Sequence, residues 1–142
     1  MSFMDGKIFL DTNIIVYSFD KAAADKNKKA KELLDLLYEK PQCLISTQVI
    51  QEFCNVAFRK MEPALSEVEV REFISTFPAN QIEIIDIDTI NRALIIKKQY
   101  RLSFWDSLVV ATALIAGCNT LYSEDMKNNI VIDGLTIKNP FI

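Results

Sequence analysis

The chain has 142 residues, 50% of them hydrophobic and 25% charged, which is enough for one compact domain with a buried core. It contains no histidine, which excludes Ser-His-Asp and Cys-His catalysis, zinc sites with imidazole ligands and every histidine general base. The formal net charge of -3 argues against a wholly electrostatic grip on nucleic acid, although a local basic patch could still bind phosphates.

We expect a cytoplasmic protein without a membrane anchor. The first residues reach acidic side chains before any long apolar stretch, unlike a secretory signal peptide. The longest uncharged apolar run, 107–118, is too short to span a bilayer. The three cysteines are scattered and form no C-x-x-C motif, so they indicate neither a disulfide framework nor a zinc site, and we expect them in the core: Cys43, Cys54 and Cys118.

Short β-rich runs alternate with helical patterns, which predicts a single α/β domain over residues 1–142 with a central, mainly parallel sheet. The predicted strands are 7–11, 42–46, 82–87, 119–123 and 129–137. The predicted helices are 24–40, 47–60, 66–77, 88–99 and 103–116. The residues that interrupt helices and strands fall at the joins between these elements: Pro41, Pro63, Pro78 and Gly117.

The first predicted strand ends in an acid. In "IFLDTNIIVYSF", residues 8–19, eight side chains are apolar and Asp11 alone is charged. An ionised carboxylate that leaves water is costly unless a partner, a metal ion or a proton compensates it, so Asp11 requires one of these. Thr12 and Asn13 follow it, either as the polar start of a helix or turn or as direct participants in a site.

The next candidate acid, Glu52, lies in a predicted amphipathic helix within "STQVIQEFCNVAFRK", residues 46–60. The apolar stripe of this helix consists of Val49, Ile50, Phe53, Cys54 and Ala57. The neighbouring polar flank consists of Gln48, Glu52, Asn55 and Arg59. On its own, this pattern is typical of a solvated glutamate. A role in a site becomes the stronger alternative if other isolated acids gather nearby.

Asp106 is the only charged residue between Leu102 and Ser123, in "LSFWDSLVVATALIAGC" and the residues after it. The predicted helix around Asp106 is apolar on nearly every face, so we expect this helix to be buried. Ser103 and Asp106 fit an S-x-x-D capping box, in which the serine caps the helix and the acid returns a hydrogen bond. A cap in the first turn also points the carboxylate toward the strand ends, so capping and a role in a site are compatible.

The fourth acid, Asp125, follows the predicted strand 119–123 by two residues. In an open α/β sheet, ligands bind beyond the carboxyl ends of the strands, near the point where the strand order reverses. If the strands before Asp11 and Asp125 are central and parallel, the two side chains therefore converge at one edge of the sheet.

The chain carries, in order, "FLDTNIIVY", "STQVIQEF", "LSFWDSLVVATAL" and "TLYSEDM" followed by "GLTIKNPF". These motifs cover essentially the whole chain and resemble the PIN-domain nucleases, more closely the VapC-type toxins of bacterial and archaeal toxin–antitoxin pairs. The resemblance implies a three-layer α/β/α PIN-like fold. It places the acidic quartet of the family on Asp11, Glu52, Asp106 and Asp125 and its hydroxyl-bearing support position on Ser123. Glu124 adjoins Asp125 and could substitute for it or simply face water.

The expected chemistry is metal-assisted hydrolysis of a phosphodiester bond. Mg²⁺ and Mn²⁺ prefer oxygen ligands, so converging carboxylates without histidine or paired cysteine suit either ion. The ion would keep the crowded acids charged and would lower the pKa of a bound water. The expected metal ligands are Asp11, Asp106 and Asp125. Glu52 would position a water or a second ion, and the remaining polar residues would orient ligands or the phosphate: Thr12, Asn13 and Ser123.

The resemblance further implies endonucleolytic cleavage of RNA, a homodimer, and an antitoxin whose tail lies across the acidic site. Basic segments at 25–31, 58–60 and 97–101 could hold RNA phosphates, although each is more typical of a solvated helix face. Phe104 and Trp105 could stack on bases, but beside an apolar helix we expect them in the core or at a subunit contact.

Two other classes of function stay open. A PIN-like domain could bind RNA or a protein partner without cutting, its acids surviving as a structural metal site, and a cleavage assay separates the two. A phosphotransfer domain of the receiver or haloacid-dehalogenase type is disfavoured. "DTNII" lacks a second aspartate two residues after the first, and the acidic pair, phosphoacceptor and lysine of a receiver cannot be placed.

Overall fold

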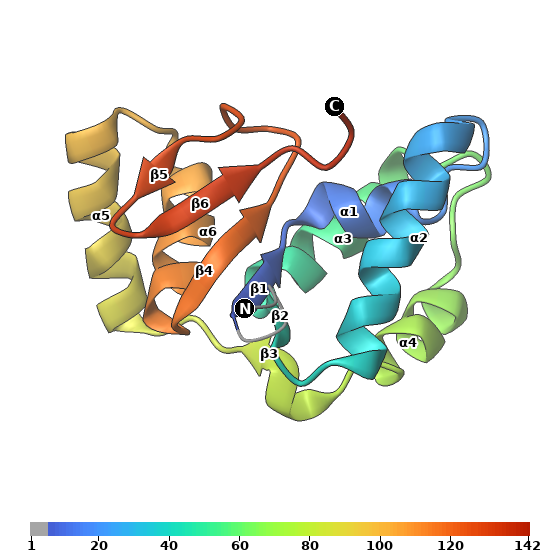
Figure 1. Ribbon diagram of the computed structural model, residues 1–142. Coiled ribbons are helices and arrows are strands. Elements are labelled where there is room, and N and C mark those ends of the chain that lie inside the picture. The colour runs from blue at the N-terminus through green and yellow to red at the C-terminus, as the bar shows by residue number, and fades with distance from the viewer. Residues whose placement is uncertain (1–5) are drawn as a thin grey trace.

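The computed structural model describes residues 6–142, which fold around one six-stranded sheet with the strand order β3-β2-β1-β4-β6-β5 (Figure 1). Neighbouring strands are parallel, except that β5 is antiparallel to β6. The sheet is therefore central and mainly parallel, as predicted. The strands are β1 (Lys7–Leu10), β2 (Cys43–Ser46), β3 (Ile82–Glu83), β4 (Cys118–Tyr122), β5 (Val131–Ile132) and β6 (Leu135–Lys138).

Six helices pack around this sheet in a three-layer α/β/α arrangement, with α6 lying along β4 and β6 and with α2 and α3 against β2 (Figure 1). The five predicted helices are confirmed to within two residues at each end. The sixth, α1, directly follows β1. The helices are α1 (Thr12–Tyr17), α2 (Ala24–Glu39), α3 (Thr47–Arg59), α4 (Glu67–Ser75), α5 (Ile87–Tyr100) and α6 (Phe104–Ile115).

Side chains that accept hydrogen bonds from free backbone N–H groups start several of these helices. Ser46 caps α3, and Ser66 forms a complete capping box with Glu69 at α4. Asp86 caps α5 by accepting from the N–H of Thr89. The polar residues at these positions therefore explain why each helix begins where it does.

Two predicted strands are wrong in extent. The run 129–137 is a hairpin, because Asp133 and Gly134 adopt φ angles of 49° and 89° and form the two-residue turn between β5 and β6. The run 82–87 contributes only Ile82 and Glu83 to the sheet. It stops there because the chain must turn so that Asp86 can cap α5.

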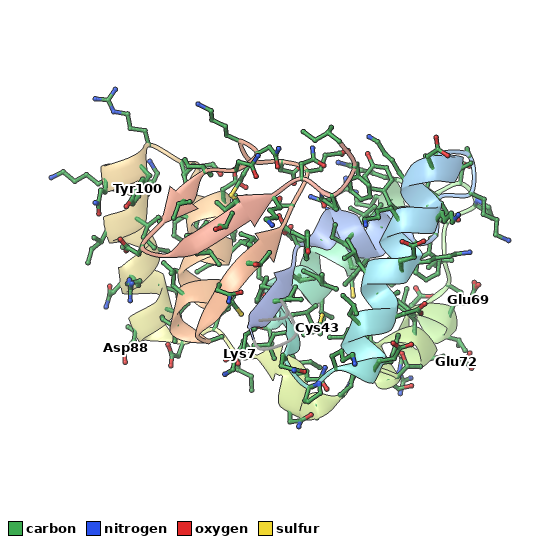
Figure 2. All side chains as sticks on the ribbon, in the orientation of Figure 1. Lys7, Cys43, Glu69, Glu72, Asp88 and Tyr100 are labelled. Carbon is green, nitrogen blue, oxygen red and sulfur yellow. The ribbon has the colours of Figure 1, made fainter. Side chains whose placement is uncertain are left out.

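The core is formed by apolar residues of the strands and of the inner helix faces. Residues 107–113 of α6 are all buried, which confirms the expectation for this helix. Cys43 lies inside the molecule, whereas Glu69, Glu72 and Asp88 lie at its periphery (Figure 2). Burial raises the pKa of Cys43 and of Cys118 to about 12. These two thiols are core residues as expected, Cys54 is half-buried, and none of the three is in a disulfide.

The strand order reverses at β1, and this places the ends of β1 and β4 side by side. The chain moves from β1 to β2 and β3 on one side, then returns to add β4 and β6 on the other. Leu10 pairs with Tyr122, and the N–H of Asp11 donates to the carbonyl of Tyr122 at 3.0 Å. Asp11 and Ser123 are thus neighbours at the switch point, where α/β sheets bind ligands.

Among the described helices, none is long and apolar enough to cross a bilayer.

Candidate active site

Asp11 is held at the end of β1 by two hydrogen bonds. The Ser123 hydroxyl donates to its Oδ2 and the Thr12 N–H donates to its Oδ1, both at 2.7 Å. Only 3% of Asp11 is exposed. The pKa of Asp11 is raised from 3.8 to about 7. Burial is the largest cause, both hydrogen bonds lower the pKa, and the charges of Asp125 and Glu52 raise it.

Asn13, in the first turn of α1, holds the segment that carries Asp125. Its Nδ2 donates to Asp125 Oδ2 at 3.1 Å, and its Oδ1 accepts from the Glu124 N–H at 3.3 Å. The Asp125 N–H donates in turn to Ser123 Oγ at 3.2 Å. Asn13 and Ser123 therefore link the exposed Asp125 to the buried Asp11, and their expected role in orienting ligands or the phosphate stays a prediction.

Glu52 also faces this site, from α3. Thr12 Oγ1 donates to its Oε2 at 2.9 Å, and Gln48 Nε2 donates to its Oε1 at 2.8 Å. The same Gln48 nitrogen lies 3.2 Å from the carbonyl oxygen of Trp105. Glu52 is half-buried, so it is not the solvated residue that its helical pattern alone suggested. The sequence places Gln48 on the polar flank one turn before Glu52 but gives no sign of its contact with Trp105.

Asp106 enters from the first turn of α6. Its N–H donates to Ser103 Oγ at 3.1 Å, so the predicted serine cap is present. Burial raises the pKa of its carboxyl, as do the charges of Asp125 and Glu52, while a hydrogen bond with Ser103 lowers it. Capping and a place in the site coexist, as expected.

A single cavity of about 540 Å³ brings the four acids together, although they come from four distant parts of the sequence. No lysine or arginine is among the described residues that line it. Trp105 is 61% exposed at this cavity, so of the two expected places, the core and a subunit contact, the core is wrong. The lining residues are Asp11, Gln48, Gln51, Glu52, Asn55, Val56, Trp105, Asp106, Val109 and Asp125.

Glu124 lies outside this cavity and contacts other residues. Lys26 Nζ lies 2.6 Å from its Oε2, and the Tyr17 hydroxyl donates to its Oε1 at 2.7 Å. Burial alone would raise its pKa, but the hydrogen bonds from Lys26 and Tyr17 and the charge of Lys26 lower it overall. Glu124 therefore joins α1 and α2 to the segment after β4, while Asp125 faces the cavity.

The donor set fits a divalent cation such as Mg²⁺ or Mn²⁺. All candidate ligands are oxygens. Burial, and to a smaller extent repulsion from Asp125 and Glu52, raises the pKa values of Asp11 and Asp106, and a bound cation would favour their charged forms. Over residues 6–142, no three acidic or cysteine side chains are grouped closely enough to hold an ion as they stand. The carboxylate oxygens of Asp11 and Glu52 instead accept hydrogen bonds from other residues of the chain.

Residues 8–128 match the model of the PIN domain family. The fold is similar to that of a toxin–antitoxin complex from Klebsiella pneumoniae, with 25% identity, a TM-score of 0.68 and coverage of 94% of this chain and 98% of that chain. No curated protein sequence was found to match.

Two further solved structures share the fold at lower identity. The first is VapC20 of Mycobacterium tuberculosis, described as a toxin that cleaves the sarcin–ricin loop, with 21% identity, a TM-score of 0.62 and coverage of 84% of this chain and 90% of that chain. The second is VapBC2 of Rickettsia felis bound to a fragment of promoter DNA, with 20% identity, a TM-score of 0.64 and coverage of 93% and 97%.

Proposed function

This chain belongs to the PIN domain family, and on that premise we propose that it is a metal-dependent endoribonuclease and the toxin of a toxin–antitoxin pair. One observation carries the proposal. Asp11, Glu52, Asp106 and Asp125 line one cavity at the switch point of the sheet, in a chain without histidine. Its fold is similar to that of VapC20, which is described as cleaving the sarcin–ricin loop.

A divalent cation is required by electrostatics in this proposal. An RNA phosphate is an anion, and the described lining of the cavity offers it carboxylates but no cationic side chain. We assign Asp11, Asp106 and Asp125 as the residues that would hold Mg²⁺ or Mn²⁺. When bound, such an ion lowers the pKa of a water and stabilises charge on the leaving oxygen.

The protein's own residues would orient the reaction. The Ser123 hydroxyl and the Thr12 N–H favour the charged form of Asp11 and fix its direction. Asn13 sets the direction of Asp125. Glu52, whose oxygens are held by Thr12 and Gln48, would orient the attacking water. In this assignment, Thr12, Asn13 and Ser123 act through the acids.

The test is cleavage of a panel of RNAs in Mg²⁺ or Mn²⁺ by the wild type and by Asp11→Asn and Asp106→Asn. We expect cleavage that EDTA abolishes and that each substitution reduces by about a hundredfold or more, because each removes a charge from the metal site. Asp88→Asn, at an exposed aspartate far from the cavity lining, is the matched control and should cleave like the wild type. Unchanged cleavage by Asp11→Asn would overturn the assignment.

A catalytically silent RNA- or protein-binding module is the second candidate. It is favoured by the hydrogen bonds that already occupy Asp11 and Glu52, and by the lack of a ready-made group of three acids within residues 6–142. The same assay separates the two candidates. A wild type that binds RNA but never cuts it, with either ion, would favour the silent module.

We propose an antitoxin and a second copy of the chain as partners, and the cytoplasm as the place of action. The toxin–antitoxin complex from Klebsiella pneumoniae supports the first. A set of exposed apolar residues on and before α5 supports association with another chain: Ile84, Ile87, Leu94 and Ile95. Light scattering of the purified chain, alone and co-expressed with the product of a neighbouring gene, tests both partners.

A further inference from the structure

The cavity has an uncharged part that the proposed hydrolysis does not use. It is lined by Trp105, Val56 and Val109, and by the amides of Gln51 and Asn55. Resting on the proposed function, we propose that this part is a subsite for one unpaired base of a single-stranded RNA. The base stacks on the indole of Trp105, and the amides of Gln51 and Asn55 bind its edge.

Trp105 is presented as a stacking surface. It is 61% exposed although it carries the largest aromatic ring of the chain. A ligand that covers this apolar surface removes it from water, which favours binding. Its ring meets that of Phe104 edge to face, with centroids 5.1 Å apart and an angle of 72°. Its carbonyl accepts from Gln48 Nε2 at 3.2 Å. The indole thus stands on an anchored helix start, beside Asp106.

Gln51 and Asn55 lie where they can bind the edge of a base. Both are on α3, one turn apart, on the same face as Glu52. Both are exposed, and neither is hydrogen-bonded through its side chain to any other residue that the structure describes. A primary amide offers a donor and an acceptor together, the combination that matches the polar edges of bases. These two amides are therefore free for a ligand.

Size and charge favour a base over the other candidate occupants. The described lining has no cation, so it does not attract a phosphate, whereas a base is neutral. A cavity of about 540 Å³ has the size of a small-molecule site. Because Trp105 and Asp106 line the same cavity, a base there belongs to a nucleotide next to the phosphate that the acids would cleave. Unpaired bases are the ones that proteins stack in this way.

Trp105 is the only tryptophan of the chain, so its fluorescence reports on this subsite alone. The experiment titrates the Asp11→Asn protein in Mg²⁺ with hexamers of rA, rC and rU, with an abasic hexamer and with a duplex. We expect saturable quenching by single strands and none by the abasic or duplex RNA. Binding detected by anisotropy of labelled hexamers without quenching of Trp105 would overturn the subsite.

Substitutions test the same subsite in the cleavage reaction. Trp105→Ala should lower kcat/KM about tenfold to a hundredfold, mainly through KM, while Trp105→Phe retains most of it. Gln51→Ala and Asn55→Ala should change the ratio of kcat/KM among the four bases. Phe58→Ala removes an exposed aromatic ring of the same helix α3 that does not line the cavity, and should change nothing.

The outcomes separate this inference from the proposed function. Cleavage that is unaffected by Trp105→Ala leaves the nuclease standing and removes the subsite. Quenching of Trp105 by single strands with no cleavage by the wild type in either ion supports the subsite and removes the nuclease. If Trp105→Ala weakens binding of a co-expressed partner protein but not of RNA, the indole belongs to a protein interface and the subsite is overturned.

Discussion

Asp11 combines nearly complete burial with two hydrogen bonds that both favour its charged form. Burial has the larger effect on its pKa, because removing a carboxylate from water costs more than two donors return, and the neighbouring acids add repulsion. The contribution of Asp11 to the free energy of unfolding therefore depends on pH and on whether a cation is bound.

The first prediction concerns the pH dependence of stability without metal. Between pH 3.8 and about 7, the folded chain holds a proton on Asp11 that the unfolded chain has released, so the free energy of unfolding falls as pH rises. The total loss from this group is about 4 kcal/mol. Urea unfolding in EDTA at several pH values should show this fall, and Asp11→Asn should remove most of it. An equal slope in Asp11→Asn would contradict the assignment.

The second prediction concerns the hydroxyl of Ser123. Ser123→Ala removes the buried donor to Asp11 Oδ2 and the part-buried acceptor for the Asp125 N–H. We expect a loss of about 1–3 kcal/mol of stability at neutral pH and reduced cleavage, because the charged form of Asp11 loses a partner. Ser75→Ala, at an exposed serine of α4, is the control and should unfold like the wild type.

At the scale of elements, the cluster of Tyr17, Lys26 and Glu124 connects α1, α2 and the segment after β4. The third prediction separates Glu124 from its neighbour. Glu124→Gln keeps the hydrogen-bonding shape but weakens the ion pair, which is partly exposed, so a small loss of stability and nearly full cleavage are expected. Asp125→Asn, one residue on, should abolish cleavage with little loss of stability. The reverse pattern would place Glu124 in the site.

The elements that the sequence predicts well are those with a strong local signal. Four of the five long helices, α3, α4, α5 and α6, begin at a side-chain cap, and α2 is marked by its buried leucines. The hairpin was missed because its strands are only two and four residues long and their apolar residues continue across the turn, although Asp133-Gly134 is a known hairpin signal. Helix α1 is predicted only as a helix or turn that starts at Thr12 and Asn13, because "IIVY" is β-branched and aromatic and favours a strand when tertiary packing is ignored.

The site was predictable in its acids but not in its uncharged lining. Asp11 and Asp106 are lone charges in long apolar stretches, and Asp125 follows a predicted strand by two residues, so all three stand out in the sequence. Trp105 is an aromatic residue next to a buried helix, and the sequence does not show on which side of the first turn its ring emerges. The role of Gln48 depends on contacts with Glu52 and with Trp105, which lies 57 residues away in the sequence.

At the scale of the whole molecule, the four acids come together only when the chain folds. A cation that binds them therefore binds the folded state and not the unfolded one, and stabilises it by mass action. Protons compete with the cation for Asp11, whose pKa is about 7, so the stabilisation should be larger above neutral pH than below it.

The fourth prediction follows from this linkage. Mn²⁺ at about a hundred times its dissociation constant should add about 2.7 kcal/mol to the free energy of unfolding at pH 8. The gain should be much smaller at pH 5.5, and Asp106→Asn should weaken it at both pH values. Thermal unfolding with and without the ion measures the effect, and Asp88→Asn serves as control. A gain that persists in Asp106→Asn would point to binding elsewhere.

The two outermost strands of the sheet, β3 and β5, are each only two residues long. Unsatisfied backbone groups along a long outer strand invite pairing with another molecule, which leads to fibrils or runaway oligomers. Here the rim offers almost no such template. Within residues 6–142, extension of the sheet from one copy to the next is therefore disfavoured.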